Sequence, residues 1–298
     1  MAGEGEDVRE GIRREVHVDM SVPAGSLSHP RWWIGTSGYS YAEWVEAGFY
    51  PEGTPAGKML SLYAQRFSAV ELNFTWYQMP RPEALERMQE QVPASFRFAA
   101  KLHRSLTHEV DADTWRQQAA QYRIGIAPLI QARQLLAVLI QLPGSFHRTA
   151  DNRRYLAALL DELAGLPLAV EFRHVSWAEE RVYAELARRK TTLAVVDTPP
   201  LPYLFPAVDV ITNPDLVYVR FHGRNLAGWR SGSMQRQFDY AYTDAELQQW
   251  IDRHWGRLTE KTGDAVLFFN NHVRGQAARN ALMLTQLLQG FRCAPSST

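Results

Sequence analysis

Charged side chains alternate with apolar ones in the segment YVRFHGRN, which runs from Tyr218 to Asn225. Arg220, His222 and Arg224 occupy every second position of a pattern that predicts a β-strand. A buried strand accommodates such groups only where they meet partners or a ligand. Four further strand-like segments repeat the alternation, and their polar faces carry Glu71 and Asn73, Lys101, Glu171 and Arg173, and Asp197. Together these side chains could bind an anion and transfer protons.

Two glutamates and a lysine on these faces are candidates for acid–base catalysis. Glu171 is predicted as the general base or acid, held by Arg173, with His222 as a second proton-transfer group. Glu71 would face the same space, and Lys101 is an alternative electrophile or Schiff-base amine. Burial raises the pKa of such carboxyl groups and neighbouring cations lower it, so both protonation states are open.

Two loops rich in glycine and arginine follow the last two strand-like segments, over residues 222–232 and 270–275. Barrel proteins often bind phosphate at these two positions, through backbone N–H groups, a helix N-terminus and cations. Glycines let the backbone approach a ligand, and arginines offer forked donors. The ligand-binding residues expected here are Arg220, Gly223, Arg224, and Asn270 and Asn271 as alternatives for the side chain that faces the ligand.

Metal binding is a weaker alternative. Glu171, Asp197 and His222 lie on successive predicted strands, and carboxylates with imidazole suit divalent metals. However, the nearby Arg173 and Arg220 would repel a cation. We therefore expect no cofactor, with a divalent metal as the less favoured possibility.

The same charges could instead neutralise one another in a purely structural network. The carboxylates Glu71, Glu171 and Asp197 balance the cations Lys101, Arg173 and Arg220. Desolvation makes buried ion pairs poor stabilisers compared with packed apolar side chains. A functional role for this cluster is therefore favoured over a purely structural one.

Eight short apolar runs along the chain predict eight β-strands. They cover residues 32–38, 69–77, 96–103, 136–143, 168–177, 192–199, 217–224 and 265–272. Helical patterns fill most of the gaps, apart from a proline-rich stretch after the sixth run. Eight strand–helix alternations predict a single-domain α/β fold, a (β/α)8 TIM-type barrel. It would span residues 31–291, between a disordered N-terminal arm (1–30) and a C-terminal tail (292–298).

The alternation within the runs predicts which side chains face the lumen of the barrel. Helices cover the outer face of each barrel strand, so the apolar set should point outward and the polar set inward. The polar set also gathers at the C-terminal ends of the strands, where barrel enzymes place their active sites. We therefore expect an enzyme that acts by acid–base chemistry on an anionic small molecule, phosphorylated molecules included, at the C-terminal mouth.

The composition of the 298-residue chain limits the classes of partner. Lys plus Arg equals Asp plus Glu, at 32 each, and this zero net charge makes nucleic acid a less favoured partner. Arginine-rich and aromatic loops nevertheless keep a nucleic-acid-binding or -processing barrel as an alternative, beside a non-catalytic ligand-binding barrel. A single cysteine, Cys293, and the lack of signal-peptide and membrane-span patterns favour a cytoplasmic protein without a membrane partner.

Seven motifs in order along the chain resemble the YecE-like family, also called domain of unknown function 72. They are IGTSGYSYAEW (34–44), VELNFTWYQMP (70–80), FRFAAKLHRSLTHE (96–109), QLP (141–143), EFRHVSW (171–177), YVRFHGR (218–224) and FNNHVRGQAARNA (269–281). The resemblance spans about Trp33 to Leu288 and implies a TIM-type barrel, while the family lends no established reaction. The family motif after the eighth strand often reads Asn-Asn-Asp, whereas His272 takes the last place here. His272 offers an imidazole and no carboxylate at that position.

Overall fold

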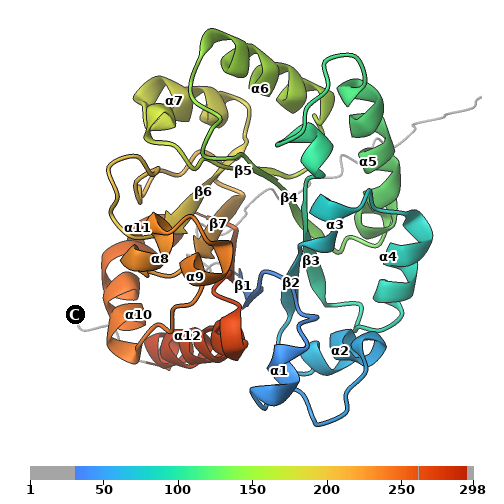
Figure 1. Cartoon of the computed structure of the whole chain (residues 1–298), viewed down its shortest axis with the longest axis vertical. Coiled ribbons are helices and arrows are strands. Elements are labelled where there is room, and N and C mark those ends of the chain that lie inside the picture. The colour runs from blue at the N-terminus through green and yellow to red at the C-terminus, as the bar shows by residue number, and fades with distance from the viewer. Residues whose placement is uncertain (1–30, 261, 294–298) are drawn as a thin grey trace, which may run out of the picture.

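Eight parallel strands curl into a barrel in the computed structural model of the protein, which describes residues 31–260 and 262–293 (Figure 1). The strands are β1 (Arg31–Thr36), β2 (Ala69–Leu72), β3 (Arg97–Lys101), β4 (Leu135–Gln141), β5 (Leu168–Glu171), β6 (Thr192–Asp197), β7 (Leu216–Phe221) and β8 (Asp264–Phe269). From β2 to β8 each strand pairs in parallel with the next, and β8 pairs with β1. The predicted TIM-type barrel is confirmed.

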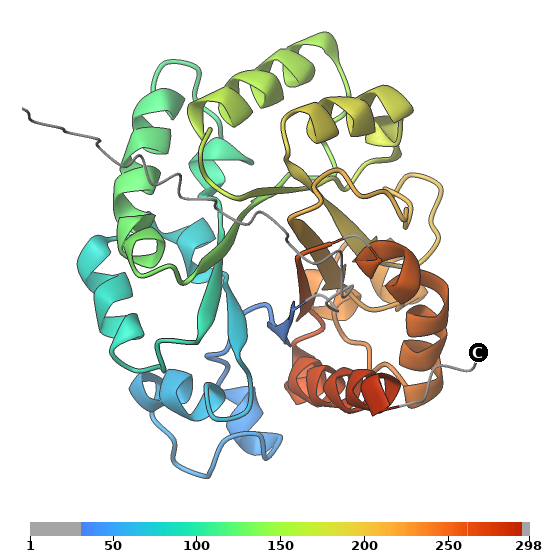
Figure 2. The same cartoon turned by 180° about the vertical axis from the view of Figure 1, so that it is seen from behind.

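A ring of helices surrounds the strands, and from behind β1 is seen between β2 and β8 (Figures 1 and 2). The α-helices are α1 (Glu43–Glu46), α2 (Ala56–Tyr63), α3 (Phe74–Tyr77), α4 (Pro82–Gln89), α5 (Trp115–Gln131), α6 (Ala150–Glu162), α7 (Glu180–Arg188), α8 (Leu226–Arg230), α9 (Met234–Gln237), α10 (Asp244–Trp250), α11 (Gly256–Thr259) and α12 (Gln276–Cys293). Single turns of 3-10 helix add η1 (Arg104–Leu106), η2 (Val175–Trp177) and η4 (Val273–Gly275), and a π-helix forms η3 (Ile251–Trp255). As predicted, residues 198–215 between β6 and β7 form no helix.

The two ends of the chain were predicted as an arm and a tail. The arm, residues 1–30, lies outside the described residues. Helix α12 continues to Cys293, which is two residues into the predicted tail, and the rest of the tail is again outside the described range. Within that range, every helix is too short or too polar to cross a membrane.

All eight strands end earlier than the apolar runs predict, and β2 illustrates one reason. It ends at Leu72 and α3 begins at Phe74, although the run predicts a strand as far as residue 77. The hydroxyl of Thr75 donates to the carbonyl oxygens of Leu72 at 2.8 Å and Lys101 at 2.7 Å. The carbonyl groups at the ends of β2 and β3 thus have hydrogen-bond partners without further pairing between the strands.

Small and aromatic side chains fill the lumen below its polar end. The interior cluster consists of Ala69, Ala99, Ala137, Leu139, Ala169, Ala194, Leu216, Tyr218, Val266 and Phe268. Two residues further along their strands, on the same face, come the predicted lumen residues Glu71, Lys101, Glu171 and Arg220. The predicted inward faces of β2, β3, β5 and β7 are therefore confirmed.

The barrel is not fully closed by strand pairing, because only an isolated bridge joins the ends of β1 and β2. The hydroxyl of Tyr63 replaces the missing ladder: it accepts from the N–H of Thr36 at 2.8 Å and donates to the carbonyl of Ala69 at 3.1 Å. Gly35 lets the strands approach here, since a Cβ at this position would lie 2.1 Å from the Ala69 oxygen. The seam between β1 and β2 is thus held by this side-chain hydroxyl, together with a bond from the Gly38 N–H to the Glu71 carbonyl at 2.8 Å.

Candidate functional site at the mouth of the barrel

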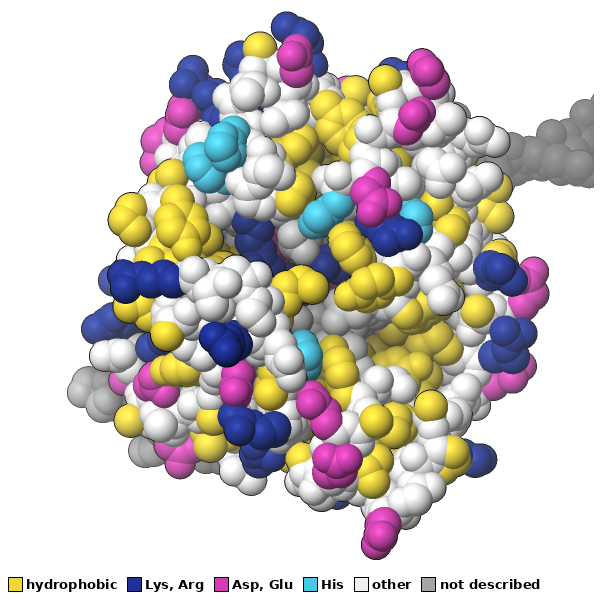
Figure 3. Space-filling view, in the orientation of Figure 1, with side chains coloured by type: hydrophobic (Ala, Val, Ile, Leu, Met, Phe, Trp, Pro, Cys, Tyr) yellow, Lys and Arg dark blue, Asp and Glu magenta, His cyan; other side chains and the backbone are white. Residues whose placement is uncertain are grey.

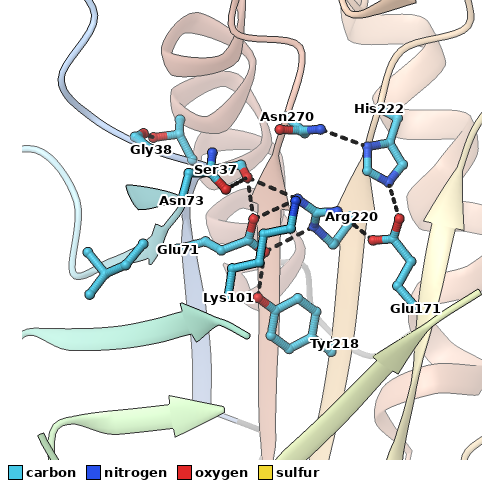
Figure 4. A network of polar contacts seen from close by, with 12 residues as sticks. Ser37, Gly38, Glu71, Asn73, Lys101, Glu171, Tyr218, Arg220, His222 and Asn270 are labelled. Atoms are coloured by element: carbon cyan, nitrogen blue, oxygen red, sulfur yellow. Dashed lines mark hydrogen bonds and ion pairs between the residues drawn. The ribbon is translucent and has the colours of Figure 1, made fainter. Parts of the chain in front are cut away.

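Arg220 joins two buried carboxylates in the lumen (Figure 4). Its Nε and Nη2 donate to the two oxygens of Glu71 at 3.0 and 2.6 Å, and its Nη1 donates to Glu171 at 2.5 Å. Tyr218 donates a further hydrogen bond to Glu71 at 2.6 Å, and the Ser37 hydroxyl accepts from Arg220 at 3.0 Å. All five side chains are at most 1 % exposed. They form a dry layer of fixed charges, which we call the platform.

The carboxylate of Glu171 stays ionised within the platform. Burial raises its pKa, but the charges of Arg173 and Arg220 outweigh burial and hold the pKa well below its usual range. The Nε of Arg173 lies 2.5 Å from Glu171 Oε1, without hydrogen-bond alignment. An ionised carboxylate of such low pKa is a weak base and has no proton to donate at neutral pH.

His222 is a neutral imidazole on the same layer. Burial and then the charge of Arg173 lower its pKa to about 3. The amide nitrogen of Asn270 lies 3.1 Å from Nδ1, so Nδ1 accepts and the ring proton sits on Nε2. That Nε2 faces Glu171 Oε1 at 3.2 Å. His222 therefore connects the end of β8 to the platform carboxylate.

A pocket of about 840 Å³ opens above the platform, at the C-terminal ends of the strands. Figure 3 shows this face hollowed, with cationic, acidic, histidine and apolar side chains around the opening. The polar or titratable residues that line it are Tyr39, Ser40, Tyr41, Asn73, Tyr77, Lys101, His108, Gln141, Arg173, His174, Tyr203, Gln237, Asn270 and His272. Within the described part of the chain, no aspartate or glutamate lines the pocket, since Glu71 and Glu171 lie beneath it.

Lys101 is the cation at the end of β3, and its side chain extends toward the end of the barrel where Asn73 and Asn270 lie (Figure 4). Among the described residues its Nζ has neither a hydrogen bond nor an ion pair, and it lies 5.1 Å from the ring centre of Trp76. Burial and then the charge of Arg220 lower the pKa of Lys101 to about 7. The amine is therefore partly unprotonated at neutral pH.

Arg173 reaches from the platform into the same pocket. Its Nε faces Glu171, and its guanidinium lies 5.7 Å from the ring centre of Trp229. Among the described residues, the two terminal nitrogens of this guanidinium have no hydrogen-bond acceptor. Its terminal nitrogens can thus offer a fork to a carboxylate or phosphate.

Asp197 was predicted to face the lumen, and the structure corrects this. In the β6–β7 ladder Val196 pairs with Arg220, which faces inward, so the next residue faces outward. Asp197 there accepts two hydrogen bonds from Arg224, at 2.9 and 2.7 Å, and one from Tyr242 at 2.7 Å. Asp197 and Arg224 are therefore paired with each other, and neither of them lines the pocket.

The loop after β7 does not present its glycine to the pocket either. Gly223 adopts a φ of +89° and packs against Tyr240, whose Cβ would lie 2.6 Å from an added Cβ. Its N–H donates to the hydroxyl of Tyr242 at 2.9 Å. The predicted phosphate-binding donors of this loop are thus occupied by groups of the protein itself.

The alternatives at the end of β8 are distinguished by the ladder. Arg220 pairs with Phe268, so Asn270 shares their inward face and lines the pocket. Asn271 points outward and donates to Asn280 at 2.8 Å and to the carbonyl of Tyr240 at 2.7 Å. Asn270 is therefore the candidate ligand-binding side chain.

Several lining residues were not predicted as site residues. Gln141 shares the inward face of β4 with Leu139 and could have been found from this alternation. His108 follows η1, and burial with the charge of Lys101 lowers its pKa to about 4. His272 stacks on Tyr41 with ring centres 4.8 Å apart. These loop residues gave no periodic signal in the sequence.

Metal binding receives no support from the side chains that are described. Within residues 31–260 and 262–293, no group of three His, Cys, Asp or Glu side chains is arranged to hold a metal ion. Of the three proposed ligands, Asp197 points to the outer layer and is bound by Arg224, and Glu171 is paired with Arg220.

Comparisons with known proteins give a consistent result. A sequence model described as "Protein of unknown function DUF72" matches residues 33–297. UPF0759 protein YunF of Bacillus subtilis is 27 % identical over 270 residues, covering 86 % of this chain and 94 % of YunF. UPF0759 protein YecE of Escherichia coli is 28 % identical over 178 residues, or 57 % of this chain and 60 % of YecE.

Solved structures of the same description share the architecture. A DUF72 family protein from Thermotoga maritima superposes with a TM-score of 0.79 at 35 % identity, covering 87 % of this chain and 99 % of that chain. A DUF72 family protein from Enterococcus faecalis gives a TM-score of 0.74 at 26 % identity, with coverage of 88 % and 98 %. The barrel fold is thus shared with these relatives.

Proposed function

Because the chain belongs to the DUF72 family, whose description assigns no reaction, we propose a function from the pocket itself. The protein is an enzyme that binds a small organic anion at the C-terminal mouth of its barrel and transfers protons through Lys101. One observation carries this proposal: two cations, Lys101 and Arg173, line the pocket, and no carboxylate of the described chain lines it with them.

The charge balance of the lumen favours an anionic ligand. Glu71 and Glu171 contribute two negative charges, whereas Arg173, Arg220 and a protonated Lys101 contribute three positive ones. The protonated form of Lys101 therefore leaves one positive charge uncompensated in a low-dielectric site, where an anion is held more strongly than in water. A bound anion would in turn raise the pKa of Lys101, which couples binding to proton uptake.

The groups have different roles in this proposal. Lys101, with a pKa of about 7, can accept or donate a proton close to neutral pH. Arg173 holds the anion by its fork, and Asn73 and Asn270 supply neutral hydrogen bonds that orient it. Glu71, Glu171 and His222 lie below the pocket lining, and they act by holding Arg220 and Arg173 in place.

A thermal-unfolding screen against carboxylates, sugar phosphates and inorganic phosphate tests the proposal. An anion at about 100 times its Kd stabilises the folded state by roughly 2.7 kcal/mol. We expect this stabilisation in the wild type and its loss in Arg173→Gln. The control variant is Arg154→Gln, because Arg154 lies on α6 with a side chain that is 75 % exposed; it should retain the shift.

Two outcomes would overturn the proposed function. One is a folded wild type that no anion of the screen stabilises. The other is a shift that survives unchanged in Arg173→Gln. Oligonucleotides belong in the same screen at low salt, since affinity that falls steeply with ionic strength would point to nucleic acid instead.

A further inference from the structure

Lys101, at the end of β3, also indicates which class of anion the pocket binds. This inference rests on the proposed function. We propose that the Nζ of Lys101 condenses with the carbonyl carbon of a 2-oxo acid whose carboxylate is held by Arg173. The product is an imine that links substrate and protein covalently. The protein would then belong to the imine-forming lyases or isomerases.

The position of Lys101 suits a nucleophile. Among the described residues its Nζ donates no hydrogen bond and forms no ion pair, although it borders a layer that contains two carboxylates. Those carboxylates are already engaged: Arg220 binds both Glu71 and Glu171 through its three guanidinium nitrogens. The amine is thus left to face the pocket, with no protein acceptor to hold it in its protonated form.

The residue type is informative because this chain uses lysine sparingly. Only four of its 32 cationic residues are lysines, namely Lys58, Lys101, Lys190 and Lys261. An arginine would serve to attract an anion, as Arg173 does, and it would do so with more donors. A guanidinium does not condense with a carbonyl under these conditions, whereas an amine does. The reactivity of an amine therefore explains why Lys101, the one lysine of the described lumen, is not an arginine.

The surroundings supply the activation that such an amine needs. Burial and the charge of Arg220 keep the pKa of Lys101 near 7, so a large fraction is unprotonated at neutral pH. The fixed hydrogen bonds of Arg220 hold that positive charge beneath the amine. This arrangement is the one in which a lysine becomes nucleophilic, next to a second cation in a desolvated site.

The condensation balances without any further reagent. The unprotonated Nζ attacks the carbonyl carbon, and the π electrons of the C=O bond move to its oxygen, which takes up a proton. The nitrogen then loses both of its protons in turn, the hydroxyl takes up a second proton and leaves as water, and a C=N bond forms. Protonation of this imine gives an iminium that withdraws electrons from the adjacent carbon, so that a proton or a carbon substituent there can leave.

The pocket also accommodates the rest of such a substrate. Its volume of about 840 Å³ exceeds that of a two- or three-carbon acid, and aromatic rings line its outer part. Tyr77 and Tyr203 are two of these rings, and they are 58 % and 47 % exposed. A planar or apolar substituent on the 2-oxo acid can pack against them while the carboxylate stays at Arg173.

Reductive trapping tests the inference on the intact protein. The purified chain is incubated with pyruvate, 2-oxoglutarate or phenylpyruvate in separate samples, each with sodium cyanoborohydride, and its mass is measured. We expect a single adduct with at least one of these acids, located on Lys101 by peptide mapping. The same acid without the reductant should leave the mass unchanged.

Matched variants assign the adduct. Lys101→Arg keeps a cation in the pocket and should abolish trapping, with the fold checked by circular dichroism. Lys58→Arg changes an exposed lysine of α2 and should trap as the wild type does. Arg173→Gln should lower the rate of trapping at least tenfold, because the carboxylate loses its anchor.

The outcomes separate this inference from the proposed function. Lack of an adduct on Lys101, or equal labelling of Lys58 and Lys190, overturns the inference. If carboxylates then still stabilise the wild type and not Arg173→Gln, the proposed function stands without the imine. Trapping that is independent of Arg173 would retain the imine and refute the carboxylate anchor.

Discussion

Arg220 donates two hydrogen bonds to the carboxylate of Glu71, from Nε to Oε2 at 3.0 Å and from Nη2 to Oε1 at 2.6 Å. This fork connects β7 to β2 across the lumen, and the third nitrogen connects both to Glu171 on β5. Three strands that are not neighbours in the sheet are thereby fixed relative to one another. The platform therefore holds the barrel in shape as well as supporting the pocket.

Replacement of Arg220 should destabilise the fold strongly. Arg220→Met leaves the carboxylates of Glu71 and Glu171 buried without their cation, and breaking such a buried pair costs about 3–5 kcal/mol. Chemical denaturation of both proteins measures the loss. The control is Arg154→Met, whose exposed pair with Asp151 is worth less than about 1 kcal/mol. Equal effects of the two substitutions would show that the platform contributes no stability.

Stability should fall with acidification from about pH 6.5 downward. His222 has a pKa of about 3 in the fold and a normal value of 6.5, so the unfolded chain binds more protons between these values. The contribution of Glu171, whose pKa is depressed, is present above its normal value of 4.5 and is lost as pH falls through the folded value. His222→Asn should reduce the slope of unfolding free energy between pH 6 and 4 by up to roughly 1.4 kcal/mol per pH unit. An unchanged slope would place a charged imidazole in the wild-type lumen.

Lys101 should titrate near neutrality. Reductive ¹³C-methylation labels the four lysines of the chain, and Lys101→Arg identifies the resonance of Lys101. We expect its midpoint at about pH 7, and a higher midpoint once an anion that stabilises the wild type is added. A midpoint near 10.5 would mean a solvated amine and would remove Lys101 from the proton-transfer role.

The lowered pKa of Lys101 also predicts that this residue reduces the stability of the folded protein. Between about pH 7 and 10.5 the unfolded chain binds one more proton at Lys101 than the folded chain, so the unfolding free energy rises with pH in this window. Below pH 7 the penalty is constant. Lys101→Met, which removes the amine, should be more stable than the wild type at pH 7 in denaturant titrations. A less stable variant would contradict a desolvated, unpaired amine.

Removal of one hydroxyl should weaken the seam between β1 and β2. Tyr63→Phe leaves the N–H of Thr36 and the carbonyl of Ala69 without this partner, at about 1–3 kcal/mol for each buried group left unsatisfied. Denaturation gives the loss, and hydrogen exchange at the Thr36 amide should accelerate. Tyr155→Phe, which loses only a bond to the Leu106 carbonyl, should cost less.

The alternation of side chains was sufficient to predict most of the lumen. It failed at Asp197 because all six residues of β6 are buried, so the strand TLAVVD shows no contrast between an inner and an outer face. The strand register could not be read from this segment. Pairing with β7, where Arg220 and His222 mark the inner face clearly, supplies the orientation in the structure.

Depth along the strand was harder to predict than direction. Glu171 is the last residue of β5 and lies beneath the pocket, whereas Arg173, two residues beyond the end of the strand, borders it. The alternation in the sequence places both side chains on the inward face and does not distinguish which of them contacts a ligand. The outer wall, including Tyr203, comes from loops that have no periodicity, so its members emerge only from the folded arrangement.

The pairing of β1 with β8 sets the order in which this chain can fold during its synthesis. Arg31 and Asp264, joined by an ion pair at this edge, are 233 residues apart in the sequence. Until residues 264–269 have left the ribosome, β1 has no ladder partner, because only an isolated bridge joins it to β2. A nascent chain that stops before β8 bears two open edges, on β1 and β7, which are ready templates for aggregation. Its pocket also lacks Asn270 and His272, so the mouth is completed only with the last strand.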